Sequence, residues 1–349
     1  MIDWTAPYMV SYKVYSVDEG TWDEKMELRW IDSLSINRDC TDAVPLLETS
    51  NMTVSTPVNS EFRDGWYRVV AYVTQGNHTE MIPLTTQWYE LESDEIDYGK
   101  KAMTVNGRSV LLPASEQYMR NGDYIAKGIN GAEWALRQLQ KCVKAPVYLL
   151  GDGFVLDRYF VYDQGESVLS AVWHILDQAK WCLQIDGRGV IRIRKSPVLP
   201  TLSIGVDDEG LLFPTIKRSR GKKDVPNQYT AKDGEWEETV TNDDPSSPSS
   251  TVNVGRVIPA DLDTAPSYID GESLWSYVRR KLEELSTKVR TYSYTREYYP
   301  DIYPMDIINV YSARNGFVGN LRVSSQQISL GENIRVGETA AEEEKLWRA

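Results

Sequence analysis

Hydrophobic and polar residues alternate over much of the first third of the chain, which is typical of β-strands with one buried face. In the segment 25–36, Met26, Leu28 and Trp30 alternate with charged residues. No helical periodicity interrupts this region, so residues 1–112 are predicted to form an antiparallel β-barrel. Three further strand-like segments lie at 66–73, 81–91 and 103–112.

One dipeptide in this region carries a specific turn signal. Asn106-Gly107 lies inside the segment 103–112. Asn and Gly both tolerate positive φ, so this pair favours a two-residue hairpin turn. The sequence therefore predicts that the last strand of the region is broken there.

The middle third changes to helical spacing. Apolar residues recur every three or four positions over 132–143, after a possible cap at Asn130. A second apolar face spans 168–179, after Asp163 and Glu166 at the spacing of a capping box. His174 lies in this second helix and is predicted to be a packed core residue. A hairpin over 182–194 completes a compact α+β region.

The last third returns to strands, with one long helix. The helix spans 271–287 after a cap at Asp270, and the loop 242–250 is polar and broken by proline. The final residues, 338–349, are predicted to be a solvated tail or a frayed helix. Strands are predicted at 226–232, 235–241, 252–258, 288–298, 307–311 and 317–330.

These elements predict a mainly β fold with α+β inserts. The coarse order of a β unit, an α+β insert and a second β unit with one helix suggests internal duplication of the architecture, without a short-period repeat. The predicted domains are a first β-barrel at 1–112, an α+β domain at 113–212, a second β-barrel at 213–337 and an acidic tail at 338–349.

Net charge argues against a protein that binds nucleic acid with its whole surface. The chain has 349 residues, with 38 basic and 51 acidic side chains, and a net charge of −13. Phosphate binding needs a basic face. Residues 1–112 hold 9 basic and 18 acidic residues, a net charge of −9 within that total. The excess acidity therefore lies mainly in the first predicted barrel.

The residues that usually carry chemistry are sparse. Three cysteines and two histidines, with no C-x-x-C pair, make a poor zinc site, and no disulfide framework is expected. No nucleotide-binding glycine motif, nucleophile elbow or zinc-protease motif is present. We therefore predict no catalytic residues, no metal and no cofactor. The apolar runs are too short to span a bilayer, and the N-terminus shows no signal peptide.

Acidic pairs offer one enzymatic alternative, because glycoside hydrolases use two carboxylates. The visible clusters are Asp207-Asp208-Glu209, Glu237-Glu238 and Asp243-Asp244. Neighbouring residues of a strand point to opposite faces, and a chain with 51 acids produces such clusters by chance. Solvated turns are the preferred interpretation.

Partner contacts are predicted instead at exposed polar or basic segments. The basic run 217–223 is interpreted as a solvated loop, although it could instead touch nucleic acid, an acidic partner or a neighbouring subunit. The loop 242–250 is the best candidate because it is expected to be exposed and unable to join a sheet. The candidate contact residues are Asp243, Asp244, Pro245, Ser246, Ser247, Lys217, Arg218, Arg220, Lys222, Lys223, Arg279 and Arg280.

The pattern over residues 202–258 resembles the central hub family of phage tail baseplates. It comprises the run 207–214, the segment 216–219, Val225-Pro-Asn-Gln-Tyr-Thr230, an Asp-Gly turn and Thr241-Asn-Asp-Asp-Pro-Ser-Ser-Pro248. The helix at 271–287 and the strand around 310–312 also fit. The resemblance covers roughly 200–335 by sequence pattern and the rest by architecture.

The resemblance implies two tube-type antiparallel β-barrel domains per chain, joined by smaller α+β domains. Three chains would form a ring that joins the sixfold tail tube to a threefold tip and leaves a lumen for DNA ejection. Implied partners are a tail tube or distal tail protein, a tape measure protein and a spike or tip protein. DNA would pass without specific binding. The location would be the virion tail, assembled in the host cytoplasm, with no membrane anchor.

Two other functions remain open at this point. A carbohydrate-binding or cell-wall-hydrolysing tail-tip protein is suggested by 11 Trp and 21 Tyr and by the acid clusters. A hub of a secretion system or tailocin would share the same physics. If the acidic first barrel faces the lumen, it would repel DNA and let it slide. The same acidity could instead face the basic segment 217–223 of a neighbouring subunit.

Overall fold

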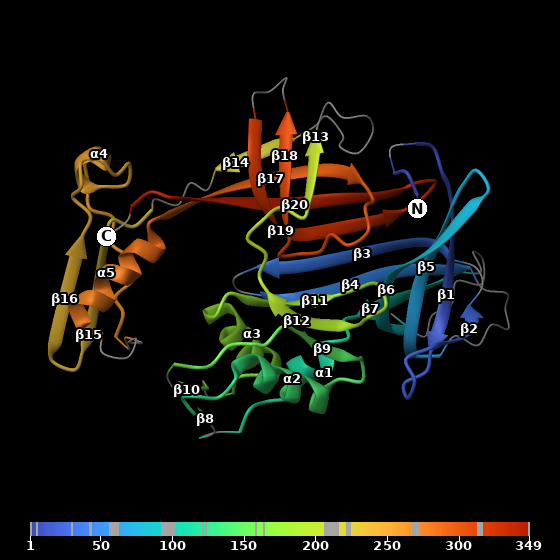
Figure 1. Cartoon of the computed structure of the whole chain (residues 1–349), viewed down its shortest axis with the longest axis horizontal. Helices are drawn as coiled ribbons and strands as arrows, with labels where there is room; N and C mark the ends of the chain where they lie inside the picture. Colours follow the sequence, from blue (N-terminus) through green and yellow to red (C-terminus); the bar gives the residue numbers. More distant parts are fainter. Residues whose placement is uncertain are drawn as a thin grey trace. The chain divides into compact units, whose positions relative to one another are not determined.

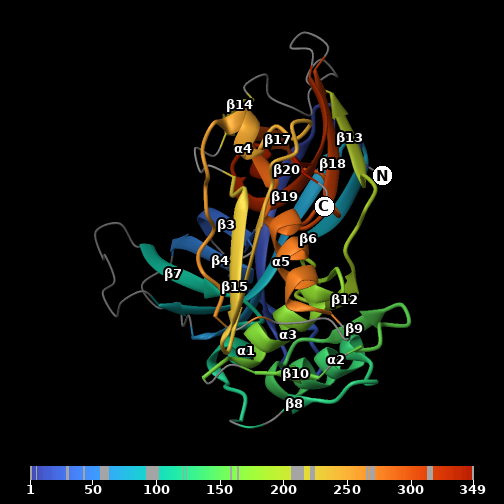
Figure 2. The same ribbon diagram turned by 90° about the vertical axis from the view of Figure 1, so that its left-hand side faces the viewer.

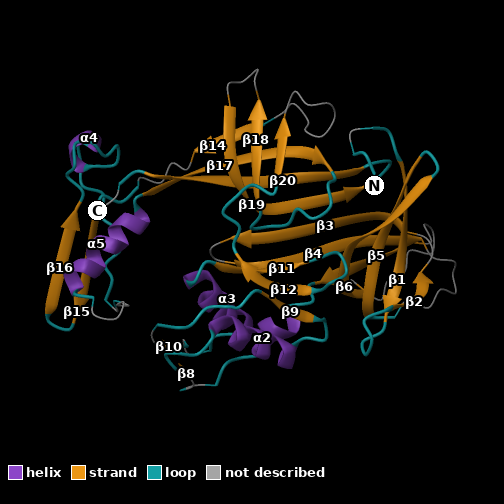
Figure 3. Ribbon diagram, viewed as in Figure 1, coloured by secondary structure: helices purple, strands orange, loops and turns teal. Residues whose placement is uncertain are grey.

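The computed structural model forms two compact units. The larger unit comprises Met1–Ile216 and Ser293–Ala340, and the smaller unit comprises Lys217–Tyr292 and Ala341–Ala349. Strands predominate in both, which confirms the predicted mainly β fold (Figure 3). The division into two tube-type barrels stays a prediction. The structure describes residues 2–4, 6–28, 31–41, 44–55, 63–91, 102–120, 122, 124–157, 159–162, 165–205, 216–220, 225–264, 266, 272–312 and 317–347.

A sheet of thirteen strands is the main element of the fold (Figure 1). Two of its strands, β13 (Leu202–Gly205) and β18 (Ile307–Ser312), lie off the main path, where β13 pairs with β18 and β18 with β19. The path itself runs β14 (Lys217–Arg220), β17 (Thr287–Glu297), β20 (Ile334–Lys345), β19 (Phe317–Leu330), β3 (Ile31–Thr41), β4 (Val44–Ser55), β7 (Ala102–Arg108), β6 (His78–Leu91), β5 (Gly65–Gln75), β1 (Met9–Val17) and β2 (Glu24–Leu28).

The pairing of β3 with β19 joins an early strand of the sequence to a late one. The two strands are antiparallel, with Ile36 opposite Ile328. Both isoleucines are buried in one hydrophobic core with Met52, Val69 and Leu84. The structure therefore confirms the predicted alternation of hydrophobic and polar residues, because the inward-facing residues of early and late strands build the same core.

The α+β region packs beside this sheet within the larger unit (Figure 1). Its core joins Val172 and Leu176 of one helix with Ala135 and Leu139 of another and with Trp66 of β5. Its helices are α1 (Leu112–Glu116), α2 (Gly131–Cys142) and α3 (Val168–Gln178). Its strands are β9 (Val147–Leu150), β11 (Trp181–Ile185) and β12 (Ile191–Lys195) in one sheet, and β8 (Tyr124–Ile125) and β10 (Phe160–Val161) in another.

The predicted cap of α2 is confirmed and supports a stability prediction. The Asn130 side-chain oxygen accepts from the backbone N–H of Ala132 at 3.1 Å and of Glu133 at 3.2 Å. Its Nδ2 donates to the Asp152 carbonyl at 2.9 Å. We expect Asn130→Ala to lower the free energy of unfolding by about 1–2 kcal/mol, because a buried helix start loses its cap. Urea titration measures it, with the exposed Asn51→Ala as a control. Equal effects of the two variants would contradict this role of Asn130.

The smaller unit has a core of its own. Tyr229, Ala231, Tyr277, Val278 and Leu282 are its buried members. Figures 1 and 2 both show α5 lying along the hairpin β15–β16. Besides β14, the start of β17 and the end of β20, the unit contains β15 (Gln228–Asp233), β16 (Trp236–Thr241), α4 (Thr251–Val254) and α5 (Leu274–Leu285).

Several predictions about single elements were wrong. The predicted strand 252–258 contains helix α4, because the Ser250 side chain caps the Asn253 N–H and Gly255 ends the helix at φ 76°. Asn106-Gly107 makes no turn and lies inside β7. A Cβ on Gly107 would lie 2.1 Å from Ser50 Oγ, so glycine is needed there for close packing.

Three further corrections concern the middle and the end of the chain. The predicted tail at 338–349 instead carries most of β20, whose residue Glu338 is buried. The caps of α3 and α5 are Ser167 and Ser273, because each serine side chain accepts from the N–H three residues later. His174 is not a packed core residue: its side chain is half exposed on α3, and its Nδ1 lies 2.6 Å from the buried Glu166 carboxylate.

Candidate partner-binding surfaces

Hydrogen bonds between its own residues hold the loop 242–250 together. Asn242 is fully buried, and its Nδ2 donates to Ser247 Oγ at 2.9 Å. Its Oδ1 accepts from the Asp244 N–H at 3.2 Å. Ser247 Oγ in turn donates to the Leu346 carbonyl at 2.8 Å. The buried polar side chains of the loop therefore find their hydrogen-bond partners within the smaller unit, and these bonds hold the shape of the loop.

The outer rim of this loop is what a partner could reach. Asp243, Pro245 and Ser246 are exposed, whereas Ser247 is buried. The Asp244 carboxylate accepts from both the Oγ and the N–H of Ser246, and these bonds hold the pKa of Asp244 below its usual range. Asp244 thus stays ionised and serves the turn. The expectation that the whole loop is exposed is wrong for Asn242, Ser247, Ser249 and Ser250, which are buried.

The two candidate arginines of α5 have partners on their own helix or next to it. The Arg279 guanidinium lies 5.2 Å from the centre of the Trp275 ring. Arg280 pairs with Glu272 at 2.8 Å and with Glu284 at 3.0 Å, and the Glu272 carboxylate raises the pKa of Arg280. Arg280 therefore serves the packing of α5, whereas Arg279 and Trp275 form an exposed cation–π pair.

The basic run is partly placed in a strand. Lys217, Arg218 and Arg220 lie in β14, and the side chains of Lys217 and Arg218 are exposed. Lys222 and Lys223 lie outside the described residues. Asp244, Ser246 and Ser247 lie together in one loop. The partners of Arg279 and Arg280 are instead Trp275 and Glu272, which lie outside that loop. The contact roles of all these residues stay predictions.

Of the acid clusters, Glu237-Glu238 and Asp243-Asp244 lie among the described residues. Glu238 lies in β16 opposite Ala231 and is exposed. The acids at 207–209 lie outside the described residues. Within the part of the chain that the structure describes, no group of three or more His, Cys, Asp or Glu side chains could hold a metal ion. No helix among those residues is long and apolar enough to cross a bilayer.

The tip of the β11–β12 hairpin is locked onto the large sheet, a contact that the sequence did not reveal. Thr86 Oγ1 donates to the Gly187 carbonyl at 3.1 Å. The Arg188 carbonyl accepts from Trp22 Nε1 at 2.8 Å and from Arg68 Nη2 at 3.2 Å. A Cβ on Gly187 would lie 1.8 Å from the Pro83 carbonyl oxygen. The α+β region is therefore fixed to β5 and β6 by backbone contacts that need glycine.

A ladder of buried polar side chains crosses five neighbouring strands, β4, β3, β19, β20 and β17. Glu48 pairs with Arg38 Nε at 3.0 Å, and Arg38 Nη1 donates to Gln326 Oε1 at 3.5 Å. Gln326 Nε2 donates to Glu338 Oε1 at 2.7 Å, and Glu338 also accepts from Arg296 Nη2 at 2.5 Å. We call these five residues the polar ladder. All five are at most 4% exposed.

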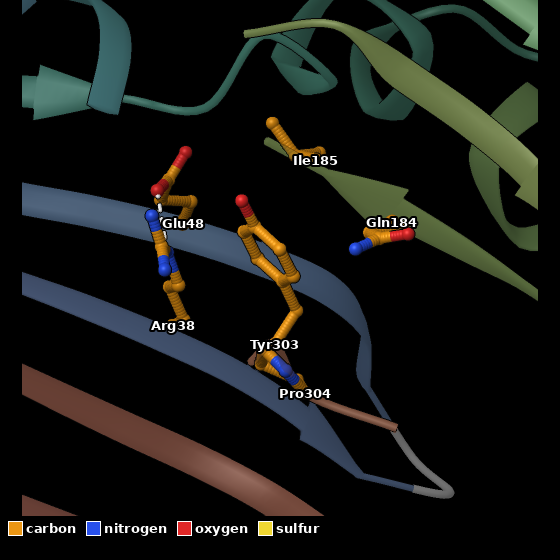
Figure 4. Close-up of a pocket in the computed structure, with 6 residues that line it drawn as sticks. All are labelled: Arg38, Glu48, Gln184, Ile185, Tyr303 and Pro304. Carbon is orange, nitrogen blue, oxygen red and sulfur yellow. Dashed lines mark hydrogen bonds and ion pairs between the residues drawn. The ribbon is translucent and has the colours of Figure 1, made fainter. Parts of the chain in front are cut away.

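Tyr303 covers one end of the polar ladder. Figure 4 shows the joined side chains of Arg38 and Glu48 beside Tyr303, with Gln184 of β11 on the other side. The Arg38 guanidinium lies 5.2 Å from the centre of the Tyr303 ring. Burial raises the pKa of Glu48 despite the neighbouring guanidinium. Such a pair is costly to desolvate, so each partner depends on the other.

Comparison with known proteins supports the sequence resemblance at the level of fold. No protein-family model matches the sequence, and no curated protein does. Among solved structures, the tail protein from Neisseria meningitidis aligns over 98% of this chain and 98% of its own, with a TM-score of 0.64 and 12% identity. The 43 kDa tail protein of prophage MuSo2 from Shewanella oneidensis aligns over 94% and 97%, with a TM-score of 0.60 and 13% identity.

A third structure agrees with these two. A prophage tail protein from Listeria monocytogenes aligns over 95% of both chains, with a TM-score of 0.54 and 10% identity. In each case the alignment includes strands from both ends of the chain and not a single domain. The chain therefore has the fold of these tail proteins.

Proposed function

We propose that this chain is the structural hub of a phage tail baseplate. Three copies form a ring that joins the sixfold tail tube to a threefold tip and leaves a lumen for DNA. The observation that carries the proposal is the likeness of fold to a tail protein along 98% of both chains. A hub works through its surfaces, so its function is assembly and not catalysis.

The partners follow from this position. A tail tube or distal tail protein lies on one side of the ring, and a spike or tip protein on the other, with the tape measure protein in the lumen before ejection. The acidic residues of the first third would repel DNA if they line the lumen, because like charges oppose contact at close range. The protein would act in the virion tail, after assembly of the tail in the host cytoplasm.

Electron microscopy of assembled tails tests the hub directly. We expect density for three copies of this chain in one ring at the end of the tail tube. A tail in which the chain lies elsewhere, or in another symmetry, would rule the hub out. The same map tests the electrostatic part, because acids confined to the outer rim would contradict DNA sliding.

The rim of the loop 242–250 offers a mutational test of partner contact. We expect Asp243→Lys to reduce incorporation of the chain into tails, because Asp243 is exposed and a reversed charge opposes a complementary partner. Quantitative immunoblotting of purified tails measures incorporation, and the exposed Glu133→Lys on α2 serves as a control. Normal incorporation of the Asp243→Lys chain would remove the loop from the contact surface.

Cell-wall hydrolysis assays test the alternative of a hydrolase. We expect no hydrolysis by the unaltered chain, and therefore no difference between it and the Glu238→Gln and Asp244→Asn variants.

A further inference from the structure

The hairpin of the smaller unit has one covered edge and one open edge. The covered edge is that of β15, where the Ala260 N–H donates to the Gln228 carbonyl at 2.9 Å. Further along, the Asp263 N–H donates to the Thr230 carbonyl at 3.1 Å. At the other edge lies β16, whose only sheet partner among the described residues is β15. The chain thus covers one edge of this sheet with its own residues and leaves the edge of β16 open.

The hydrogen bonds of β15 show which backbone groups face outward at the open edge. Every second residue of β15, beginning with Gln228, bonds toward the covering segment 258–263. The residues between them therefore turn their N–H and C=O groups toward the even-numbered residues of β16. Glu237 and Thr239 consequently point their own N–H and C=O groups away from β15. Such a row of outward backbone groups is a template for an added strand.

The side chains along this edge are acidic and include an exposed tryptophan. Glu237 and Glu238 are both exposed, and as neighbours in a strand they project to opposite faces of the sheet. Trp236 is 79% exposed. A large aromatic ring in water beside outward backbone groups is typical of an interface anchor. The acids oppose the pairing of two β16 edges with each other, because like charges would then meet across the strands.

A basic edge with the matching pattern lies elsewhere in the same chain. The strand β14 is the first on the path of the thirteen-stranded sheet, and among the described residues it pairs with β17 alone. Its residues Lys217, Arg218 and Ser219 are exposed. Two adjacent basic side chains of β14 therefore correspond to the two adjacent acids of β16. Each copy of the chain thus carries two open strand edges of opposite charge.

We propose that β14 of one copy adds to β16 of the next copy as an antiparallel strand. The charges favour a register with three cross-strand pairs, Lys217 with Glu238, Arg218 with Glu237 and Ser219 with Trp236. A contact between two unlike surfaces joins copies head to tail, and it closes into a ring where the rotation from copy to copy fits. The closure into a ring of three rests on the proposed hub function, whereas the strand pairing itself does not.

Charge reversal in the full chain tests the pairing. Glu237→Lys with Glu238→Lys makes the β16 edge basic, and Lys217→Glu with Arg218→Glu makes the β14 edge acidic. Analytical ultracentrifugation measures self-association. Each double variant alone is expected to associate at least about tenfold more weakly than the unaltered chain, because like charges then face each other. An equimolar mixture of the two variants should recover association, since each altered edge then meets the opposite charge.

The controls separate strand pairing from general attraction and from misfolding. The unaltered chain has a net charge of −13 and each double variant changes it by four units, so both variants stay negative and do not attract each other as whole molecules. Glu133→Lys with Asp177→Lys changes the net charge equally at exposed positions of α2 and α3, and should leave association unchanged. Thr239→Pro removes an outward N–H but no charge, and should weaken association. Circular dichroism checks that each variant keeps its strands.

The outcomes for the pairing and for the hub are distinct. An unaltered chain that stays monomeric up to millimolar concentration, a mixture that recovers no association, or double variants that associate normally would each overturn the pairing. Association of the unaltered chain into open fibres, with recovery in the mixture, would contradict the hub and support the pairing. Rings of three in tails built from either double variant alone would support the hub and overturn the pairing.

Discussion

Arg38→Met is expected to lower the free energy of unfolding of the larger unit by about 3–5 kcal/mol, because it leaves the Glu48 carboxylate buried without its counter-charge. Arg38 also donates to the Leu84 carbonyl at 2.5 Å and to Gln326, so the loss reaches three strands. Urea unfolding followed by tryptophan fluorescence measures the change. The exposed Arg137→Met on α2 removes an ion pair with Glu133 and should change stability by less than about 0.5 kcal/mol.

A double variant separates the charge from the shape of the arginine. Arg38→Met combined with Glu48→Met removes both charges and retains apolar volume. It is expected to be more stable than Arg38→Met alone, because the unpaired carboxylate is gone. A double variant as unstable as the single one would show that packing, and not the uncompensated charge, causes the loss. A single variant as stable as Arg137→Met would contradict the role of the polar ladder altogether.

Gly187→Ala is expected to release the hairpin tip from the sheet and to cost about 3 kcal/mol or more, because the new methyl group overlaps the Pro83 carbonyl. Backbone cannot yield as a flexible side chain would. Hydrogen exchange should accelerate at the tip and in the facing part of β6. Gly65→Ala is the matched control, since its Cβ would meet nothing closer than 3.8 Å. Unchanged exchange at the tip would show that the lock is not needed to hold it.

Local patterns predicted most of the elements correctly. The strand pattern from 81 to 91 and the hairpin over 182–194 both depend on residues close in sequence, and the structure confirms them as β6 and as β11–β12. The apolar stripe that follows Asn130 is likewise found in α2. Errors arose where two local signals compete. Val252 and Val254 favour a strand, but Ser250 and Gly255 supply both ends of a short helix.

The sites were harder to predict than the elements because their residues come from distant segments. Arg38 and Glu48 look like ordinary polar positions of alternating strands. That face of the sheet is buried only because β19 pairs with β3 and brings in Gln326, which lies 288 residues after Arg38 in the sequence. The one available signal was that Arg38 stands at an inward position of its strand, where a hydrophobic residue is expected. That signal does not predict which side chain pairs with Arg38. The contact of the β11–β12 hairpin tip with β5 and β6 likewise depends on a turn whose two glycines look ordinary in the sequence.

The pairing of β3 with β19 has a consequence for biosynthesis. At roughly 5–20 residues per second, the ribosome needs on the order of 15–60 s to deliver β19 after β3 has emerged. During that interval the growing chain carries an open strand edge and an arginine and a glutamate without the interior that later covers them. Closing so long a loop is also entropically slow. Folding of the sheet is therefore expected to be post-translational, and chains shortened before β19 should aggregate or be captured by chaperones.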